Sequence, residues 1–240
     1  GAYGTYSDRI STSDITTSVG SNVFRGYLEG ASRFQFDPYW SFSASGRYAS
    51  DRTFLRRYDI SRDDRLRSTF SVERIGGKSY FSLAGWAVQT LRTGDPQGLA
   101  PMALPELDYR LRMDTPLVGG TVQLQANSLA IARSEGQDTQ RAFASAKWDR
   151  RTINGLGQEM TFTMLARGDV YNSADNASTL TAIYRGETGW QTRSIFAASA
   201  DIKWPFVGQT FGGTQIFTPR VQVVAAPAIG NLNIPNEDSR

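Results

Sequence analysis

The sequence predicts an all-β fold in which antiparallel strands follow one another as an up-and-down meander. Three observations support this. Residues 106–114 alternate apolar and polar side chains without a fault, which places the two kinds on opposite faces of a strand. The alternation recurs along the chain with aromatic residues near many strand ends, and short and long connections take turns. Together these features are typical of part of a large transmembrane β-barrel.

Eleven strand candidates follow one another at fairly even spacing. Strand-forming residues fill them, and Gly, Pro, Asn and Asp separate them. They cover residues 2–10, 23–36, 39–49, 65–74, 79–91, 106–114, 120–132, 140–149, 158–168, 192–203 and 214–226. Residues 177–188 are compatible with either a short helix or a strand. The whole chain, residues 1–240, is expected to be one partial barrel domain and an excerpt of a longer protein.

The predicted connections differ in length. Residues 75–78 form a tight hairpin, in which Gly76 and Gly77 are free to take positive φ. Longer connections are expected at 92–105, 133–139 and 169–191, a short one at 115–119, and moderate ones at 150–157 and 204–213. Outer-membrane barrels have short periplasmic turns and longer outer loops, so the alternation favours a barrel over a soluble sandwich.

Composition excludes several classes of function. The 26 basic and 23 acidic residues nearly balance, so no nucleic-acid footprint is indicated. Cysteine and histidine are absent, which removes disulfides, thiolate metal sites, cysteine nucleophiles and the usual general base. No apolar run approaches the length of a transmembrane helix. We expect no enzyme activity, no cofactor and no metal.

The polar positions of the predicted strands give the candidate functional residues. If the apolar faces meet lipid, the opposite faces line a lumen. The candidate lumen-facing residues are Arg67, Glu73, Asp108, Arg110, Arg112, Asp114, Gln123, Gln125, Arg141, Lys147 and Arg167. We expect Asp108, Arg110, Arg112 and Asp114 to pair with charges on neighbouring strands.

Two tryptophans lie just before shorter connections. Trp148 and Trp204 stand where an interfacial aromatic girdle would require them. The same positions also suit residues that cap a soluble core, and the two interpretations stay open.

The densest charge cluster covers residues 52–67. Asp59, Asp63 and Asp64 lack the spacing of a calcium-binding EF-hand loop. Phosphate capture by the arginines of this cluster is chemically sensible, but a solvated, self-paired loop is favoured. Glu106, Asp108 and Asp114 share one strand face, yet interleaved arginines hold them ionised, which disfavours a glycosidase.

Several runs resemble the outer-membrane lipopolysaccharide-assembly protein LptD family, also called organic solvent tolerance protein. These runs are residues 53–61 (TFLRRYDIS), 79–83 (SYFSL), 104–109 (LPELDY), 167–171 (RGDVY) and 235–240 (PNEDSR). Their order and spacing extend the similarity from about residue 24 onward.

The resemblance implies delivery of lipopolysaccharide to the outer leaflet of the outer membrane in Gram-negative bacteria. It implies a barrel of about 26 strands, with lipopolysaccharide, the lipoprotein plug LptE and a periplasmic bridge protein as partners. The family's N-terminal periplasmic domain, its remaining strands and its cysteines are absent from this chain. No gate residue is carried over.

Two alternatives belong to other classes. A diffusion porin would share the alternation but would close on fewer strands and conduct ions. A soluble β-sandwich or carbohydrate-binding module would pack its apolar faces against each other.

Overall fold

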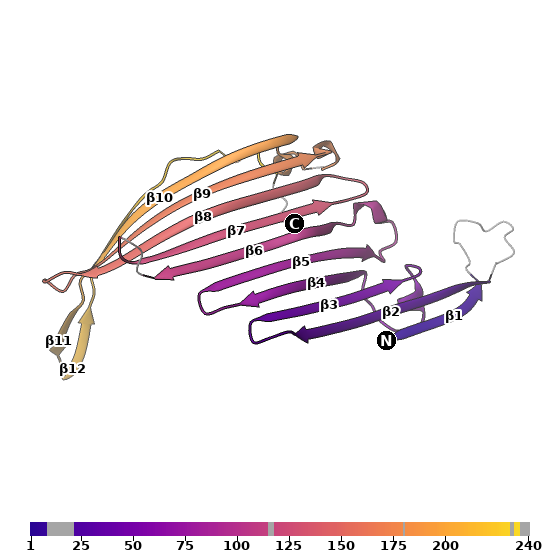
Figure 1. The fold of residues 1–240 in the computed structure, drawn as a ribbon, viewed down its shortest axis with the longest axis horizontal. Coiled ribbons are helices and arrows are strands. Elements are labelled where there is room, and N and C mark those ends of the chain that lie inside the picture. Colours follow the sequence, from indigo (N-terminus) through magenta and orange to yellow (C-terminus); the bar gives the residue numbers. More distant parts are fainter. Residues whose placement is uncertain (9–21, 115–117, 180, 231–232, 236–240) are drawn as a thin grey trace.

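The computed structural model describes residues 1–8, 22–114, 118–179, 181–230 and 233–235. One antiparallel sheet of eleven strands dominates it (Figure 1). Its strands are β1 (Ala2–Asp8), β2 (Asn22–Gln35), β3 (Trp40–Ala49), β4 (Arg65–Ile75), β5 (Ser79–Thr90), β6 (Met102–Asp114), β7 (Thr121–Ala132), β8 (Asp138–Ile153), β9 (Glu159–Ala174), β10 (Gly189–Lys203) and β13 (Arg220–Ala225). Strands β11 (Phe206–Thr210) and β12 (Gly213–Phe217) form a separate hairpin.

The order of strands in the sheet is the order of strands in the chain. Each strand from β1 to β9 pairs with the next strand in the chain. Strand β13 pairs with the C-terminal part of β10, from Ala198 to Lys203. Figure 1 shows these strands in one curved layer, and the sheet does not close on itself. The predicted antiparallel meander and partial barrel are confirmed. A β-sandwich would need a second large sheet, and the other sheet in the described residues has two strands.

Successive connections fall at opposite ends of the sheet because the strands are antiparallel. One end, here called the short-connection end, carries the connections at 36–39, 76–78, 115–120 and 154–158. The long-connection end carries those at 50–64, 91–101, 133–137 and 175–188. The alternation is imperfect, because 133–137 is short and the β11–β12 hairpin lengthens the short-connection end.

Several predicted boundaries are wrong. Strand β6 begins at Met102 instead of residue 106, and its register shifts between Ala103 and Glu106, where Pro105 has no N–H to donate. Strand β9 continues to Ala174, so only 175–188 of the predicted excursion lies outside strands. The predicted strand 214–226 is two strands, β12 and β13. Residues 9 and 10 of the first predicted strand lie outside the described residues.

Other local predictions differ in detail. Gly76 donates to the carbonyl of Ser79 (2.7 Å) and closes the tight turn, but neither Gly76 nor Gly77 takes a positive φ. The undecided region 177–188 contains a short helix, α2 (Ala182–Arg185), after a 3₁₀ turn at Asn176–Ser178. Another 3₁₀ turn lies at Gln97–Leu99. None of the helices in the described residues is long and apolar enough to cross a membrane.

A small core forms where the 50–64 connection joins the sheet. This connection contains helix α1 (Phe54–Arg57), whose Phe54 and Leu55 are fully buried. They belong to a buried cluster whose other members are Tyr27, Ala49, Leu66 and Leu91. Elsewhere the wide apolar side of the sheet stays exposed, as a wall that meets lipid requires.

Candidate functional site

The paired strands carry their apolar residues on one face. The register aligns Leu111 with Leu124, Leu124 with Ala146, and Ala146 with Ala166 and then Phe196. Partners in a ladder lie on the same face, so this row belongs to a single apolar surface across β6–β10. Large side chains on this surface are exposed, and these include Phe24, Leu28, Phe34, Tyr109, Met113, Phe162, Met164, Phe196, Val221 and Val223.

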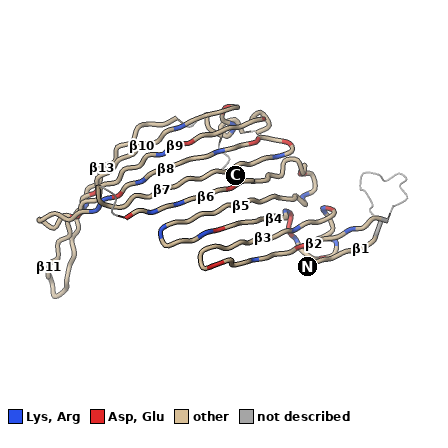
Figure 2. The backbone as a smooth tube through the Cα atoms, in the orientation of Figure 1, with Lys and Arg blue, Asp and Glu red and all other residues tan. Residues whose placement is uncertain are grey.

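All eleven candidate residues lie on the opposite face, which we call the polar face. The register aligns Glu73 with Ser82, Ser82 with Asp108, and Arg110 with Gln125. The other candidates follow by strand parity through the same ladders: Arg67, Arg112, Asp114, Gln123, Arg141, Lys147 and Arg167. Figure 2 shows basic and acidic positions close together near both ends of the strands.

Five candidates come together around one hollow of about 470 Å³ near the 76–78 turn. We call it the basic hollow. Its cations are Lys78, Arg110, Arg112 and Lys147, and Gln123 and Gln125 also line it. Lys78 is not among the predicted candidates because it belongs to a turn, where strand alternation does not apply; the fold brings it beside β6.

Each cation of the basic hollow has a carboxylate partner. The pairs are Arg110–Asp108 (2.5 Å), Arg112–Asp114 (3.1 Å), Lys78–Asp114 (3.2 Å) and Lys147–Asp149 (3.1 Å). The four cations are each at least 44% exposed, so the pairs contribute little to stability. The hollow is therefore a solvent-accessible network of ion pairs on the polar face.

The predicted pairing between neighbouring strands is wrong for Arg110 and Arg112. Both pair with a carboxylate two residues away on their own strand. Residues i and i+2 share a strand face, so a long arginine side chain can fold back along the strand. Asp114 does reach outside its strand, to Lys78.

A second cluster of charges surrounds Asp169 nearer the long-connection end. Its carboxylate is 1% exposed and accepts hydrogen bonds from Arg167 (2.6 Å) and Arg193 (3.2 Å). Arg193 also donates to the hydroxyl of Tyr171 (2.9 Å), and Arg167 stacks 3.7 Å from the centre of the Phe143 ring. Arg167 is the one member of this cluster among the predicted candidates; Asp169 was missed because Gly168 and Asp169 resemble the start of a loop.

Of the remaining candidates, Arg67 lies apart, whereas Glu73 lies beside the basic hollow and Arg141 beside the Asp169 cluster. The guanidinium of Arg67 lies over the Trp86 ring at 4.8 Å, and Glu73 accepts a hydrogen bond from the Tyr80 hydroxyl (3.0 Å). Arg141 aligns with Tyr171. The eleven candidates thus share a face, and beyond the five at the basic hollow they are spread along it. This distribution is typical of residues that line a passage, whereas catalytic residues converge on one point.

Trp148 and Trp204 both lie at the short-connection end. The indole N–H of Trp148 donates to the carbonyl of Gly119 (2.8 Å), and that of Trp204 to the carbonyl of Leu156 (3.0 Å). Each ring therefore has a satisfied polar edge beside an apolar body, as residues at a membrane interface do.

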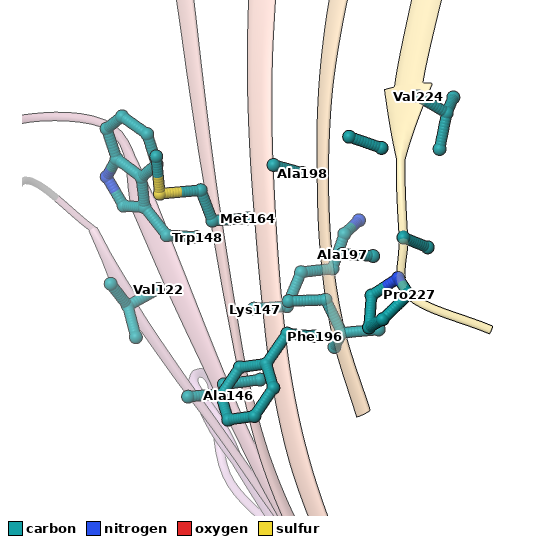
Figure 3. A pocket seen from close by; sticks show the side chains of 14 residues that line it. Val122, Ala146, Lys147, Trp148, Met164, Phe196, Ala197, Ala198, Val224 and Pro227 are labelled. Carbon is teal, nitrogen blue, oxygen red and sulfur yellow. The ribbon is translucent and has the colours of Figure 1, made fainter. Parts of the chain in front are cut away.

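An apolar hollow of about 790 Å³ lies beside Trp148, over β7–β10 and β13. Val122, Ala146, Trp148, Met164 and Phe196 line it from the apolar face (Figure 3). Lys147 is the one charged residue in its lining, so it offers no acid–base pair. The described residues also contain no group of His, Cys, Asp and Glu side chains that could hold a metal ion.

A continuous antiparallel meander with one apolar and one polar face defines a protein of the transmembrane β-barrel class. The family model of LPS transport system D, LptD, matches residues 23–240. The chain therefore belongs to the LptD family. A comparison with curated proteins finds no match.

Family membership fixes the broad function. LptD proteins transport and assemble lipopolysaccharide at the outer membrane of Gram-negative bacteria, and the family is not one of enzymes. The resemblance found in the sequence is thus confirmed over nearly the whole chain.

Proposed function

We propose that residues 1–240 form one partial barrel domain that serves as wall of a lipopolysaccharide translocation barrel, with the polar face toward the lumen. The observation that carries this proposal is the placement of all eleven candidates opposite the apolar surface. Water in the lumen solvates the ion pairs, and lipid covers the apolar rows.

The polar face suits a passage for an amphipathic, phosphorylated glycolipid. The exposed guanidinium of Arg110 can bind a phosphate group in place of Asp108, whose carboxylate also accepts a hydrogen bond from Gln125 (3.3 Å). The lipoprotein plug LptE and lipid head groups are the proposed contacts of this face, and a periplasmic bridge protein is the proposed source of the lipid.

Photo-crosslinking in cells tests this proposal. p-Benzoylphenylalanine at Gln125 on the polar face is expected to form an adduct with lipopolysaccharide that disappears when lipopolysaccharide synthesis is blocked. The same residue at Leu124, which the register places on the apolar face, is the matched control. We expect its synthesis-dependent adduct to be several-fold weaker.

The two positions are adjacent in the chain, so expression and insertion are shared. Equal adducts at Gln125 and Leu124, or none at Gln125 during active synthesis, would show that the polar face is not the path.

A further inference from the structure

The connection 50–64, here called the arginine cap, is held firmly against the long-connection end of the sheet. Its Phe54 and Leu55 are buried in the core cluster. Its Asp51 accepts two hydrogen bonds from Arg25, both 2.7 Å, and the two side chains are 7% and 4% exposed. The cap is therefore a folded platform, and residues on its outer side keep defined positions.

The carboxylates of the cap are directed toward the sheet and its neighbouring connection. Three of its four aspartates pair with arginines outside the cap: Asp51 with Arg25 (2.7 Å), Asp63 with Arg47 (2.6 Å) and Asp64 with Arg92 (3.3 Å). The expected self-pairing within residues 52–67 is wrong for Asp63 and Asp64, which pair with Arg47 and Arg92, although both carboxylates are solvated as expected.

The arginines of the cap take no part in these ion pairs. Arg56, Arg57 and Arg62 are exposed, and none has a carboxylate partner among the residues that the structure describes. Arg52 donates to the carbonyl of Arg92 (3.0 Å) and likewise pairs with no described carboxylate. Only Asp59 remains to offset these four guanidinium groups, so the cap presents an excess of positive charge.

This arrangement differs from the basic hollow, where every cation already has a carboxylate. An exposed arginine without a carboxylate partner suits phosphate, because its planar fork of donors matches phosphate oxygens. The long-connection end is the outer end in barrels of this class. The ligand nearest to that end is the phosphorylated headgroup layer of the outer leaflet.

We propose that Arg56, Arg57 and Arg62 of the arginine cap bind phosphate groups of lipid headgroups in the outer leaflet. This site rests on the proposed function for its orientation, and the cap packs at the outer rim on Arg25, Tyr27 and Arg47 of the polar face. It anchors the wall in the layer of glycolipid that the protein helps to build.

The test uses p-benzoylphenylalanine in place of Tyr58, an exposed residue between Arg57 and Asp59, in the intact protein in cells. The expected adduct is with lipopolysaccharide, and it persists after synthesis is blocked, since outer-leaflet lipid remains. The triple variant R56Q/R57Q/R62Q is expected to lose it at least tenfold, because each arginine near an anionic lipid surface contributes about fivefold in affinity. Enzymatic removal of the lipid A phosphates is expected to cause the same loss.

The matched control is R33Q/R74Q/R150Q, which removes three arginines that also lack a described carboxylate partner but lie near the short-connection end. We expect it to leave the Tyr58-position adduct unchanged. An absent adduct, an adduct that survives the cap substitutions, or an equal loss in the control overturns the site. Failure of the translocation proposal would instead remove the Gln125 adduct during active synthesis, whatever happens at the cap.

Discussion

Replacing Asp51 by Ala is expected to lower the free energy of unfolding by about 3–5 kcal/mol, the typical cost of leaving one partner of a buried ion pair alone. The side chain of Arg25 would stay buried without a countercharge, and Thr53 would lose its hydrogen bonds to the same carboxylate. Equilibrium unfolding in denaturant, with the protein folded in detergent micelles, measures the change.

Asp63→Ala is the control for this effect. Asp63 also pairs with an arginine, Arg47 at 2.6 Å, but the two side chains are 47% and 30% exposed. Its loss should cost less than about 1 kcal/mol. If both substitutions lowered the free energy of unfolding equally, burial of the Arg25–Asp51 pair would not explain its contribution to stability.

The pH dependence provides a second signature of Asp51. Burial raises the pKa of this carboxyl, but hydrogen bonds from Arg25 and Thr53 outweigh burial and hold its pKa well below the usual range. A depressed folded-state pKa stabilises the fold above the unfolded-state value, and this contribution is lost as the pH falls toward the folded-state value. The stability difference between the native protein and Asp51→Ala should therefore shrink below about pH 4.

A charge placed on the apolar face should also have a large effect. Ala126→Arg is expected to cost about 2–4 kcal/mol on folding into a bilayer, because the guanidinium would face hydrocarbon. Ala126 pairs with Tyr109 and Ala144 in the middle of the apolar surface. Reversible folding into lipid vesicles, followed by denaturant titration, measures the cost.

Gln125→Arg is the matched control on the polar face and should change the stability by less than about 1 kcal/mol, because water in the lumen solvates the charge. The two positions are neighbours on β7, so secondary-structure propensity and depth are shared. A similar cost at both positions would mean that the two faces meet the same environment.

The period-two pattern predicted which residues share a face, because successive side chains of a strand point to opposite sides of the sheet. Val122 and Leu124 alternate with Gln123 and Gln125, and the register confirms that the two sets lie on opposite sides of the sheet. Boundaries were harder to predict. Pro105 looked like the end of a loop, whereas the sheet accommodates it with an irregular register.

Contacts between distant segments could not be predicted from alternation. Phe54 and Leu55 occupy a four-residue helix, too short for a helical period to show, and their core partners come from β2, β3 and β4 and from Leu91. Similarly, Asp169 acquires Arg193 from β10 only through the ladder. Alternation in the sequence predicts the face on which a side chain lies. Its partners depend on which strands and connections the fold places beside it.

The most direct test of lipid on one face and water on the other uses single cysteines in β6. Residues 1–240 contain no cysteine, so single cysteines introduced from Leu107 to Met113 can carry spin labels with no other thiol in this part of the wall. In bilayers, we expect high accessibility to oxygen at Leu107, Tyr109, Leu111 and Met113. We expect high accessibility to a water-soluble paramagnetic reagent at the residues between them. Loss of this alternation, or its reversal, would contradict the account.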